Sequence, residues 1–527
     1  MIRSTFGGFT TAQLAMAASQ RALDVTGQNI ANINTEGYTR QRLDIASLNT
    51  RSGNVYNGMK DIHVGYGVEM TGVSQLRDPF LDAQYRSQIS KLGTTDGQAA
   101  GLEKLADIFD ETTTEGVRNA LVQITSAIDT YNNMQVGNQE FDTMVRANMQ
   151  ILLNLFHENA TRLQDIRDDV GQGFETTDVA DLNKILENIS NLNTSIKNSQ
   201  VVGNPALELQ DERNKLVDEL ASYLPIEVKY WDKEVGPGVS VEVMDVYFVD
   251  TNGQKHSLVS DALHGYFNAD VGADSAKLTL YDAKGNLGFN VTNILGNGTL
   301  KGTLDFINKQ GDFDGSDFKG IGYYEKSLDT LVDKFAKVFN ELNKKPLLNA
   351  DGTVQRDPAT NDILFEDAPL FETTDGSTTF TASNIRISAD WINGNYGLTT
   401  SITPGADGKI PSGGNDNLLR MIDALKADQS FEYNGLQFFK GSFYSCFANI
   451  ESTLGVDTKS AQTTLTNQIS VLNQTSNSRD AVSGVQLDEE GMNLMHYNQS
   501  YTAAARLMTT LDEALDTLIN RTGVVGR

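Results

Sequence analysis

The stretch "NIANINTEGYTR", residues 29–40, ends a regular apolar repeat and so marks the end of the first predicted helix. Asparagine is a weak helix former whose side chain satisfies nearby backbone groups, so Asn32 and Asn34 are suited to closing a helix. Gly37 permits a positive φ, which lets Tyr38 fold its ring back onto the helix. These residue types predict a helix C-terminus followed by a tight turn.

Upstream of this stretch the apolar residues recur every seven positions. The large side chains are Phe9, Met16, Leu23 and Ile30, and the small residues Ala12, Ser19 and Thr26 lie between them. Such a narrow stripe is typical of a helix that packs closely against another helix.

The C-terminal end carries a fuller repeat. One heptad position holds Leu494, Tyr501, Met508 and Leu515, and the position three further on holds Tyr497, Ala504, Leu511 and Leu518. The preceding "LDEE", residues 487–490, places its carboxylates where the exposed amides of a helix N-terminus favour negative charge. The two ends therefore predict long helices with coiled-coil packing. Spacing alone leaves open that each stripe packs within its own globular domain.

The middle of the chain has a different character from its ends. All nine prolines lie between Pro79 and Pro411, and proline interrupts helices. Asp78 and Pro79 predict a helix start, and separate amphipathic segments follow, two of them at 149–170 and 182–196. Beyond Pro225 the apolar residues alternate, and hairpin turns are predicted at Asn252-Gly253 and at Lys284-Gly285-Asn286.

These patterns predict an α+β multidomain fold with paired N- and C-terminal long helices, a helical bundle and inserted β-rich modules. The expected terminal-helix inner domain comprises residues 1–40 plus 485–527. The expected helical-rich middle domain comprises 41–225 plus 297–345 and 412–484. A β-rich inserted module is expected at 226–296, and a small β or mixed outer module at 346–411. Insertions of this kind bring the two termini of a chain close together.

Composition narrows the classes of function. The chain has 42 Lys and Arg against 69 Asp and Glu, and its net charge of -27 repels nucleic-acid phosphates and anionic lipids. The single cysteine, Cys446, excludes an intramolecular disulfide and is interpreted as a buried, inert thiol. The five histidines lack zinc-site spacing, and Asp312, Asp314 and Asp317 form an acidic turn without the closing glutamate of a calcium loop. We expect no metal, no cofactor, no membrane insertion and no enzyme active site.

Two segments together resemble a known family. Residues 6–41 strongly resemble the N-terminal signature of bacterial flagellar axial proteins, the subunits of rod, hook and junction, and residues 483–520 resemble the matching C-terminal signature. Within that group, Tyr38-Thr39-Arg40-Gln41 is similar to the Gly-Tyr-Ser-Arg-Gln ending of the flagellar hook-associated protein 1 (FlgK) family, with Thr39 in place of serine. Residues 483–490 are similar to the Ser-Gly-Val-x-Leu-Asp-Glu-Glu of the same family. The middle β modules match only in outline.

The resemblance implies a structural subunit that forms a ring at the junction between hook and filament, with hook protein below and the third hook-associated protein above. It implies a secreted, extracellular location reached by type III export without a cleaved signal, and an export chaperone bound to the C-terminal helix. The lack of an apolar run of signal-peptide type then no longer indicates the cytoplasm. Another axial subunit, such as hook or distal rod, and a surface-exposed adhesin are the alternatives.

The expected assembly interface lies on the terminal helices. It comprises Phe9, Met16, Leu23, Ile30, Asn32, Gly37, Tyr38, Arg40, Leu487, Leu494, Tyr497, Tyr501, Ala504, Met508, Leu511, Leu515 and Leu518. A helix with an apolar stripe and no large core of its own is marginal, because helix nucleation is costly. We therefore expect both termini to be poorly ordered in the free monomer and to fold on assembly.

Overall fold

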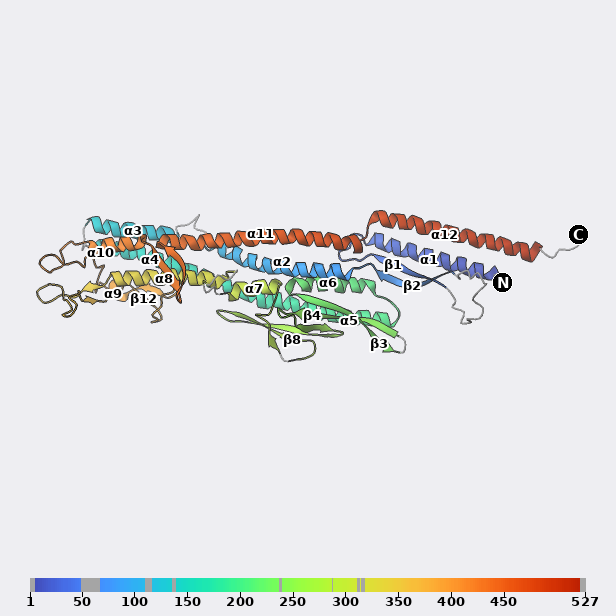
Figure 1. The fold of residues 1–527 in the computed structure, drawn as a ribbon, viewed down its shortest axis with the longest axis horizontal. Helices are drawn as coiled ribbons and strands as arrows, with labels where there is room; N and C mark the ends of the chain where they lie inside the picture. The colour runs from blue at the N-terminus through green and yellow to red at the C-terminus, as the bar shows by residue number, and fades with distance from the viewer. Residues whose placement is uncertain are drawn as a thin grey trace, which may run out of the picture.

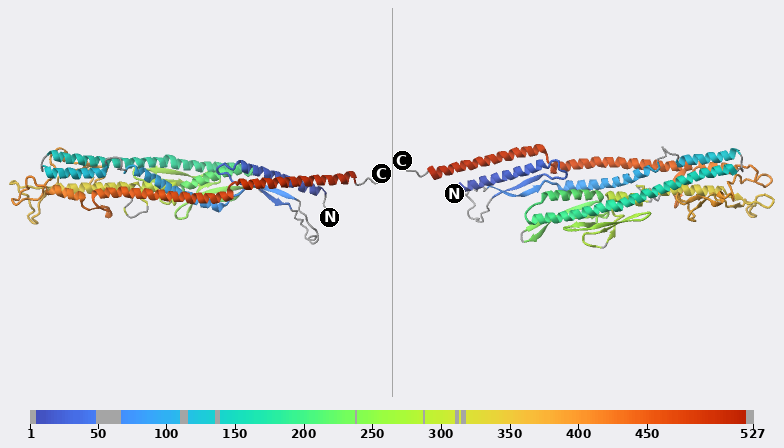
Figure 2. Two further views of the ribbon diagram at one scale, coloured as in Figure 1. Left: turned by 90° about the horizontal axis from the view of Figure 1, so that it is seen from above. Right: turned by 180° about the vertical axis from the view of Figure 1, so that it is seen from behind.

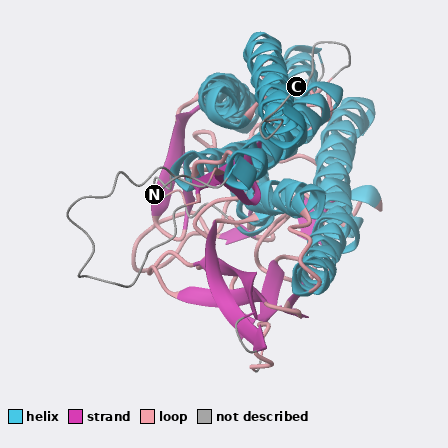
Figure 3. Cartoon of the chain, turned by 90° about the vertical axis from the view of Figure 1, so that its right-hand side faces the viewer, coloured by secondary structure: helices cyan, strands magenta, loops and turns pink. Residues whose placement is uncertain are grey.

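The computed structural model describes residues 5–48, 67–109, 116–134, 139–236, 239–286, 288–309, 313 and 318–521. These segments build a long, thin molecule with both termini at the same end (Figures 1 and 2). Viewed along its length, most helices gather on one side and the larger strands on the other (Figure 3). The predicted α+β fold with long terminal helices is confirmed. The acidic turn at Asp312, Asp314 and Asp317 lies outside the described residues.

The terminal helices pack against each other. Helix α1 (Thr5–Ala31) and helix α12 (Leu487–Asp516) run antiparallel, and a π-helical turn, Thr517–Arg521, extends α12. At one end of their contact, a Cβ added to Gly8 would stand 3.0 Å from Leu511 Cδ1. At the other end, Asn29 Nδ2 donates to Glu490 Oε2 at 3.2 Å. The predicted pairing of the two ends is therefore confirmed.

A two-stranded ribbon follows α1, within a region that was expected to be helical. Strand β1 (Gln41–Ser47) pairs antiparallel with β2 (Val68–Gln75), and the register shifts between Asp44 and Ile45. Both strands contact α1. Most of their side chains are exposed or half-buried, so alternation between apolar and polar residues is weak here.

Two long helices, α2 (Pro79–Ala106) and α11 (Phe443–Ser483), run side by side along the shaft (Figure 1). The predicted start of α2 is confirmed, because Asp78 Oδ1 accepts a hydrogen bond from Phe80 N at 2.9 Å and Pro79 occupies the first turn. Helix α11 extends over 41 residues, and the short link 484–486 joins it to α12.

Glycines bring α2 against α7 (Thr299–Asn308) at backbone distance. On α2 they recur every four residues at Gly93, Gly97 and Gly101, and α7 contributes Gly302. A Cβ added to Gly302 would stand 2.3 Å from Thr94 O, which no real Cβ tolerates. The two helices therefore touch along a line where no larger residue fits.

The next helices form the bundle beside this shaft. Helix α3 (Val117–Met134) buries one apolar face, which includes Leu121, Ile124 and Ile128. Helix α4 (Gln139–Gly173) continues through a π-helical turn, Phe174–Asp178, into α5 (Val179–Val201), where separate segments were expected. A π-turn inserts one residue into the helical repeat, which shifts the apolar stripe and makes one helix look like two. Helix α6 (Leu207–Tyr223) then returns alongside α5.

The alternating region forms two sheets on one side of the bundle. The first has the order β3 (Ile226–Gly236), β4 (Val239–Val249), β5 (Lys255–Ser260) and β6 (Leu263–His264), all antiparallel. The second has β7 (Tyr266–Val271), β8 (Ala276–Tyr281) and β9 (Phe289–Asn290). Both predicted turns are confirmed, with φ of +77° at Gly253 and +75° at Gly285.

The far end of the molecule combines helices with small strand pairs. Helix α8 (Ile321–Leu342) leads to β10 (Lys345–Pro346), β11 (Phe365–Glu366), β12 (Phe371–Thr373), β13 (Ile385–Ile387) and the short α9 (Ala389–Ile392). After α10 (Asp416–Lys426), a hairpin of β14 (Gln429–Tyr433) and β15 (Leu436–Gly441) was not predicted. Its Asn434-Gly435 turn, with positive φ at both residues, was the available signal.

One apolar core runs through the shaft and the far end, and among the described residues it includes none from α1 or α12. Cys446 lies within this core, so its predicted burial is confirmed, and burial raises the pKa of its thiol. Within the described ranges, no helix is long and apolar enough to cross a membrane, and no group of three or more His, Cys, Asp or Glu could hold a metal ion.

Candidate assembly site at the base of the terminal helices

The seam between α1 and α12 is lined by small residues on the α1 side. Ala12, Ser19 and Thr26 are buried, whereas the larger heptad residues flank them and are half-buried: Phe9, Met16, Leu23 and Ile30. Small residues at heptad spacing allow the two helix axes to approach closely. The predicted stripe therefore does face α12, with its small members at the centre of the contact.

On the α12 side, the predicted residues divide into two groups. Ala504 is buried, and five others are half-buried along the same stripe: Tyr497, Tyr501, Met508, Leu511 and Leu515. The remaining three are exposed: Leu487, Leu494 and Leu518. Across its 30 residues, α12 fully buries only Glu490 and Ala504.

The turn after α1 closes as its residue types predict. Asn32 Nδ2 donates to Gln28 O at 3.0 Å, and Gly37 has φ of +82°. Tyr38 folds back and its hydroxyl donates to Asn29 Oδ1 at 2.9 Å. Gln41 N donates to the same oxygen at 3.0 Å, so Asn29 ties the helix end to both sides of the turn. Asn29 was not among the predicted site residues, because a buried asparagine on a helix gives no periodic signal.

Arg40 joins three segments of the chain at one point. Its Nε donates to Glu490 Oε1 at 2.7 Å and one terminal nitrogen donates to Glu489 Oε2 at 2.5 Å, both in the first turn of α12. Its backbone N donates to Ser483 O at 2.9 Å at the end of α11, and its O accepts from Leu76 N at 2.9 Å. The acidic start of α12 was predicted as a helix start, and the structure adds its role as the partner of Arg40.

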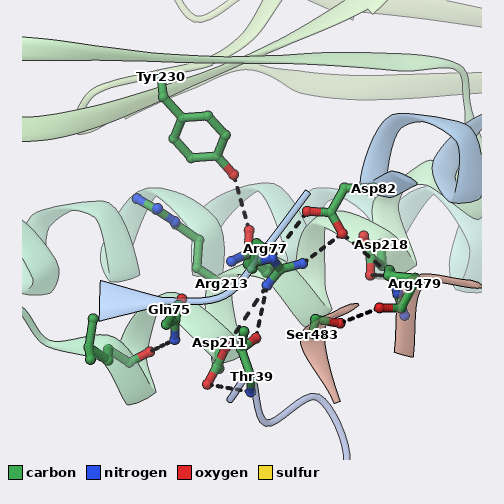
Figure 4. Close-up of polar contacts among 12 residues, drawn as sticks. Thr39, Gln75, Arg77, Asp82, Asp211, Arg213, Asp218, Tyr230, Arg479 and Ser483 are labelled. Atoms are coloured by element: carbon green, nitrogen blue, oxygen red, sulfur yellow. Dashed lines mark hydrogen bonds and ion pairs between the residues drawn. The ribbon is translucent and has the colours of Figure 1, made fainter. Parts of the chain in front are cut away.

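On the shaft side, a second charged cluster holds the turn (Figure 4). Thr39 N donates to Asp211 Oδ2 at 3.1 Å, and Arg77 Nε and a terminal nitrogen donate to the two oxygens of Asp82 at 3.1 and 3.0 Å. Deeper in the cluster, Asp218 accepts from Arg86 Nε at 2.7 Å and from Arg479 at 2.6 Å. Helices α2, α6 and α11 thus meet the turn through paired charges.

Burial raises the pKa of two groups in this cluster. Burial raises the pKa of Tyr38 above its usual range, and the carboxylates of Asp211, Glu208 and Glu490 add to this effect, so the phenol stays protonated and keeps donating to Asn29. Burial also raises the pKa of Asp211, although the hydrogen bonds from Thr39 oppose this rise. The donors and acceptors of the cluster fix the terminal pair on the shaft.

Comparison with known proteins agrees with this arrangement. A model of the flagellar hook-associated protein FlgK helical domain matches residues 102–357. A flagella basal body rod protein model matches residues 9–39, and a flagellar basal body rod FlgEFG protein C-terminal model matches residues 479–521. The last two matches coincide with α1 and α12, and the first with the shaft and the β sheets.

Whole-chain relatives carry the same name. Flagellar hook-associated protein 1 of Bacillus subtilis is 28% identical over 534 residues, which cover 99% of this chain and 100% of the relative. That of Escherichia coli is 25% identical, with 97% of this chain and 98% of the relative covered. The structure of the flagellar hook junction protein FlgK from Burkholderia pseudomallei is 12% identical with a TM-score of 0.54, covers 76% of this chain and 100% of its own, and shows a likeness of fold. The chain therefore belongs to the flagellar hook-associated protein 1 (FlgK) family of structural flagellar proteins.

Proposed function

We propose that this structural component of the flagellar hook-filament junction joins its neighbours through α1 and α12. The observation that carries the proposal is the sparse burial of the terminal pair. Helix α12 fully buries two of its 30 residues, while Leu487, Leu494 and Leu518 remain exposed. A helix with so little burial gains little from its own chain, and neighbouring copies in a tube would supply the missing contacts at roughly 1.5–3 kcal/mol for each large apolar side chain covered.

We further propose that the domains follow the division expected from the sequence. The terminal pair, 1–40 plus 485–527, would line the central channel, and the helical middle, 41–225 plus 297–345 and 412–484, would lie around it. The modules 226–296 and 346–411 would lie further out. The paired charges around Arg40 support this division, because they lie where the chain leaves α1 and where it enters α12.

The association with other flagellar hook proteins follows from the family, and its finer form is part of this proposal. Hook protein would contact the ring from below and the third hook-associated protein from above. The chain would reach the extracellular junction by type III export, with a chaperone on the segment of α12. A scaffolding role without catalysis agrees with the site, whose charged groups pair with one another.

Labelled antibody on intact cells tests this function. We expect a single spot at the distal end of each hook in cells that make the chain, and none in cells from which its gene is deleted. A coat along the hook would indicate another axial subunit. A diffuse surface signal would indicate an adhesin, and either result would contradict the junction assignment.

A further inference from the structure

One flank of α12 presents apolar side chains to solvent near the base of the terminal pair. Leu487, Leu494 and Met495 are 58%, 40% and 58% exposed, and their spacing places them on the same side of the helix around Gly491. This flank lies about a quarter turn around α12 from the seam with α1. No atom lies within 4 Å of a Cβ added at Gly491, so no close contact within its own chain requires a glycine at this position.

A cleft lies beside the same base, between α1, the β1–β2 ribbon and the loop after α5. Its volume is about 890 Å³, which suffices for several side chains. Its walls include Arg21, Asp24, Leu43, Met70, Pro205 and Glu242. The α1 residues among them stand on the face opposite Gly8 and Ala12, which face α12. Met70 is 41% exposed, and Leu43 and Val73 line the same ribbon wall, so this wall is partly apolar.

Both surfaces also carry charged side chains, some of them without an ion-pair partner among the described residues. In the cleft, Asp44 pairs with Arg42 at 3.2 Å, and Glu242 pairs with Arg213 at 3.7 Å. Arg21 and Asp24 make no ion pair within the part of the chain that the structure describes, so the unpaired charges of the cleft are of both signs. The same holds for the exposed Asp488 at the start of the α12 flank.

We propose that the flank of α12 around Gly491 in one copy docks into this cleft of the next copy. The inference deepens the proposed function and rests on it. Because flank and cleft are different surfaces, each copy uses one to bind a neighbour on one side and the other to bind a neighbour on the opposite side. Such a heterologous contact repeats head to tail and closes into a ring or continues as a helix.

The flank and the cleft lie at similar positions along the long axis of the molecule, which allows this contact between neighbouring copies. Asn29 meets Glu490 and Gly8 meets Leu511, so the cleft residues of α1 lie beside the part of α12 that directly follows the flank. A neighbour placed sideways therefore needs only a small axial shift to insert Leu494 and Met495 beside Met70. The missing side chain at Gly491 would allow the cleft wall to approach the helix backbone.

Cross-linking in assembled flagella tests the contact. Cells would co-express two tagged variants, Met495→Cys and Met70→Cys, and isolated flagella would be treated with a bis-maleimide reagent. We expect a dimer that contains one chain of each kind. Cys446 is fully buried and so does not react in the folded chain. The control pair, Thr464→Cys on the exposed face of α11 with Met70→Cys, should give no dimer.

A larger side chain at Gly491, in the centre of the flank, provides a second test. Gly491→Leu should abolish filament attachment, because the side chain fills the space that the cleft wall occupies, while leucine favours the helix of the free chain. Gly455→Leu on α11 is the matched control, since its Cβ also meets nothing within 4 Å, and it should attach filaments normally. If both Cys variants assemble into flagella and no dimer forms, the docking proposal is wrong. It is also wrong if Gly491→Leu forms normal junctions. Neither result would contradict the proposed function. Absence of the wild-type chain from flagella would overturn the proposed function as well.

Discussion

Arg40 and Glu490 lie 450 positions apart in the sequence, yet Arg40 Nε is 2.7 Å from Glu490 Oε1 in the fold. This ion pair connects the turn after α1 with the first turn of α12, and the Glu490 side chain is only 2% exposed. The backbone of Arg40 is also bonded to the end of α11 and to the residue after β2. Arg40 is therefore one of the residues that fix the position of the terminal pair on the shaft.

Replacement of Arg40 by alanine should loosen this joint. Glu490 would be left buried without its cation, and breaking a buried pair in this way costs about 3–5 kcal/mol. Hydrogen exchange on isolated flagella should then show faster exchange across α1 and α12, with α8 unchanged. Arg42→Ala is the matched control, because the Arg42 side chain is 59% exposed and its pair with Asp44 is worth under about 1 kcal/mol. Equal exchange in the two variants would contradict the role of Arg40.

Substitution at the glycine line between α2 and α7 should destabilise the shaft. A methyl group at Gly302 would stand 2.3 Å from the backbone oxygen of Thr94, so one helix must move, at a cost of about 1–3 kcal/mol for Gly302→Ala. In Gly455→Ala the new methyl group meets nothing within 4 Å, and better helix propensity should stabilise the chain by about 0.5–1 kcal/mol. Urea unfolding measures both changes, and a stabilising Gly302→Ala would disprove the close contact.

Periodic features were predictable from the sequence, and features made by distant polar residues were not. The heptad stripes at both ends predicted the α1–α12 pair, and the Asn252-Gly253 turn predicted the β4–β5 hairpin, because each pattern lies within one short segment. Asn29, by contrast, bonds Tyr38, Gln41 and Glu490, and only the fold brings these groups together. The β1–β2 ribbon was missed for a related reason, since few of its side chains are buried and its alternation is weak.

The family resemblance supplied what periodicity could not decide. Spacing alone left open that each terminal stripe packed in a separate domain, whereas two terminal signatures in one chain implied a pair. The seam itself differs from an ordinary coiled coil, because Ala12, Ser19 and Thr26 form its centre on α1. Their burial was not predictable from size alone, since the larger heptad residues carry the stronger apolar signal.

The terminal helices of the free chain should exchange their amide hydrogens much faster than the shaft. Helix α12 fully buries two residues and contributes none to the shaft core, while α8 buries a whole face from Ile321 to Phe339. Low burial implies a low free energy of local opening. Hydrogen exchange on the free chain and on isolated flagella should show protection of α1 and α12 appearing only in flagella. Full protection of both helices in the free chain would contradict folding on assembly.

Removal of residues 488–527 should leave the shaft folded and abolish the junction. The shaft core lies between Leu102 and Leu454 and does not include the deleted segment. Urea unfolding of the shaft should therefore change little, whereas α1 loses the partner of its seam and becomes sensitive to protease. Cells that make only the truncated chain should build hooks without attached filaments. Normal filament attachment would refute the assembly role of α12.

Asp329 on α8 should make stability depend on pH. Burial raises its pKa from 3.8 to about 6, and its Oδ1 accepts a hydrogen bond from Ala382 N at 2.7 Å. A raised pKa means that the folded state binds the proton more tightly, so this contribution is complete below about pH 4 and is lost as the pH rises through about 6. Asp329→Asn keeps the acceptor without the charge.

This variant should therefore be more stable than the wild type at pH 8, by roughly 1–3 kcal/mol, and the difference should shrink towards pH 4.5. Urea unfolding at the two pH values measures this change. Asp362→Asn, at an exposed position, is the control and should follow the wild type at both. If Asp329→Asn were less stable than the wild type at pH 8, the aspartate would be stabilising the fold as a charged group, and burial would not be the dominant influence on it.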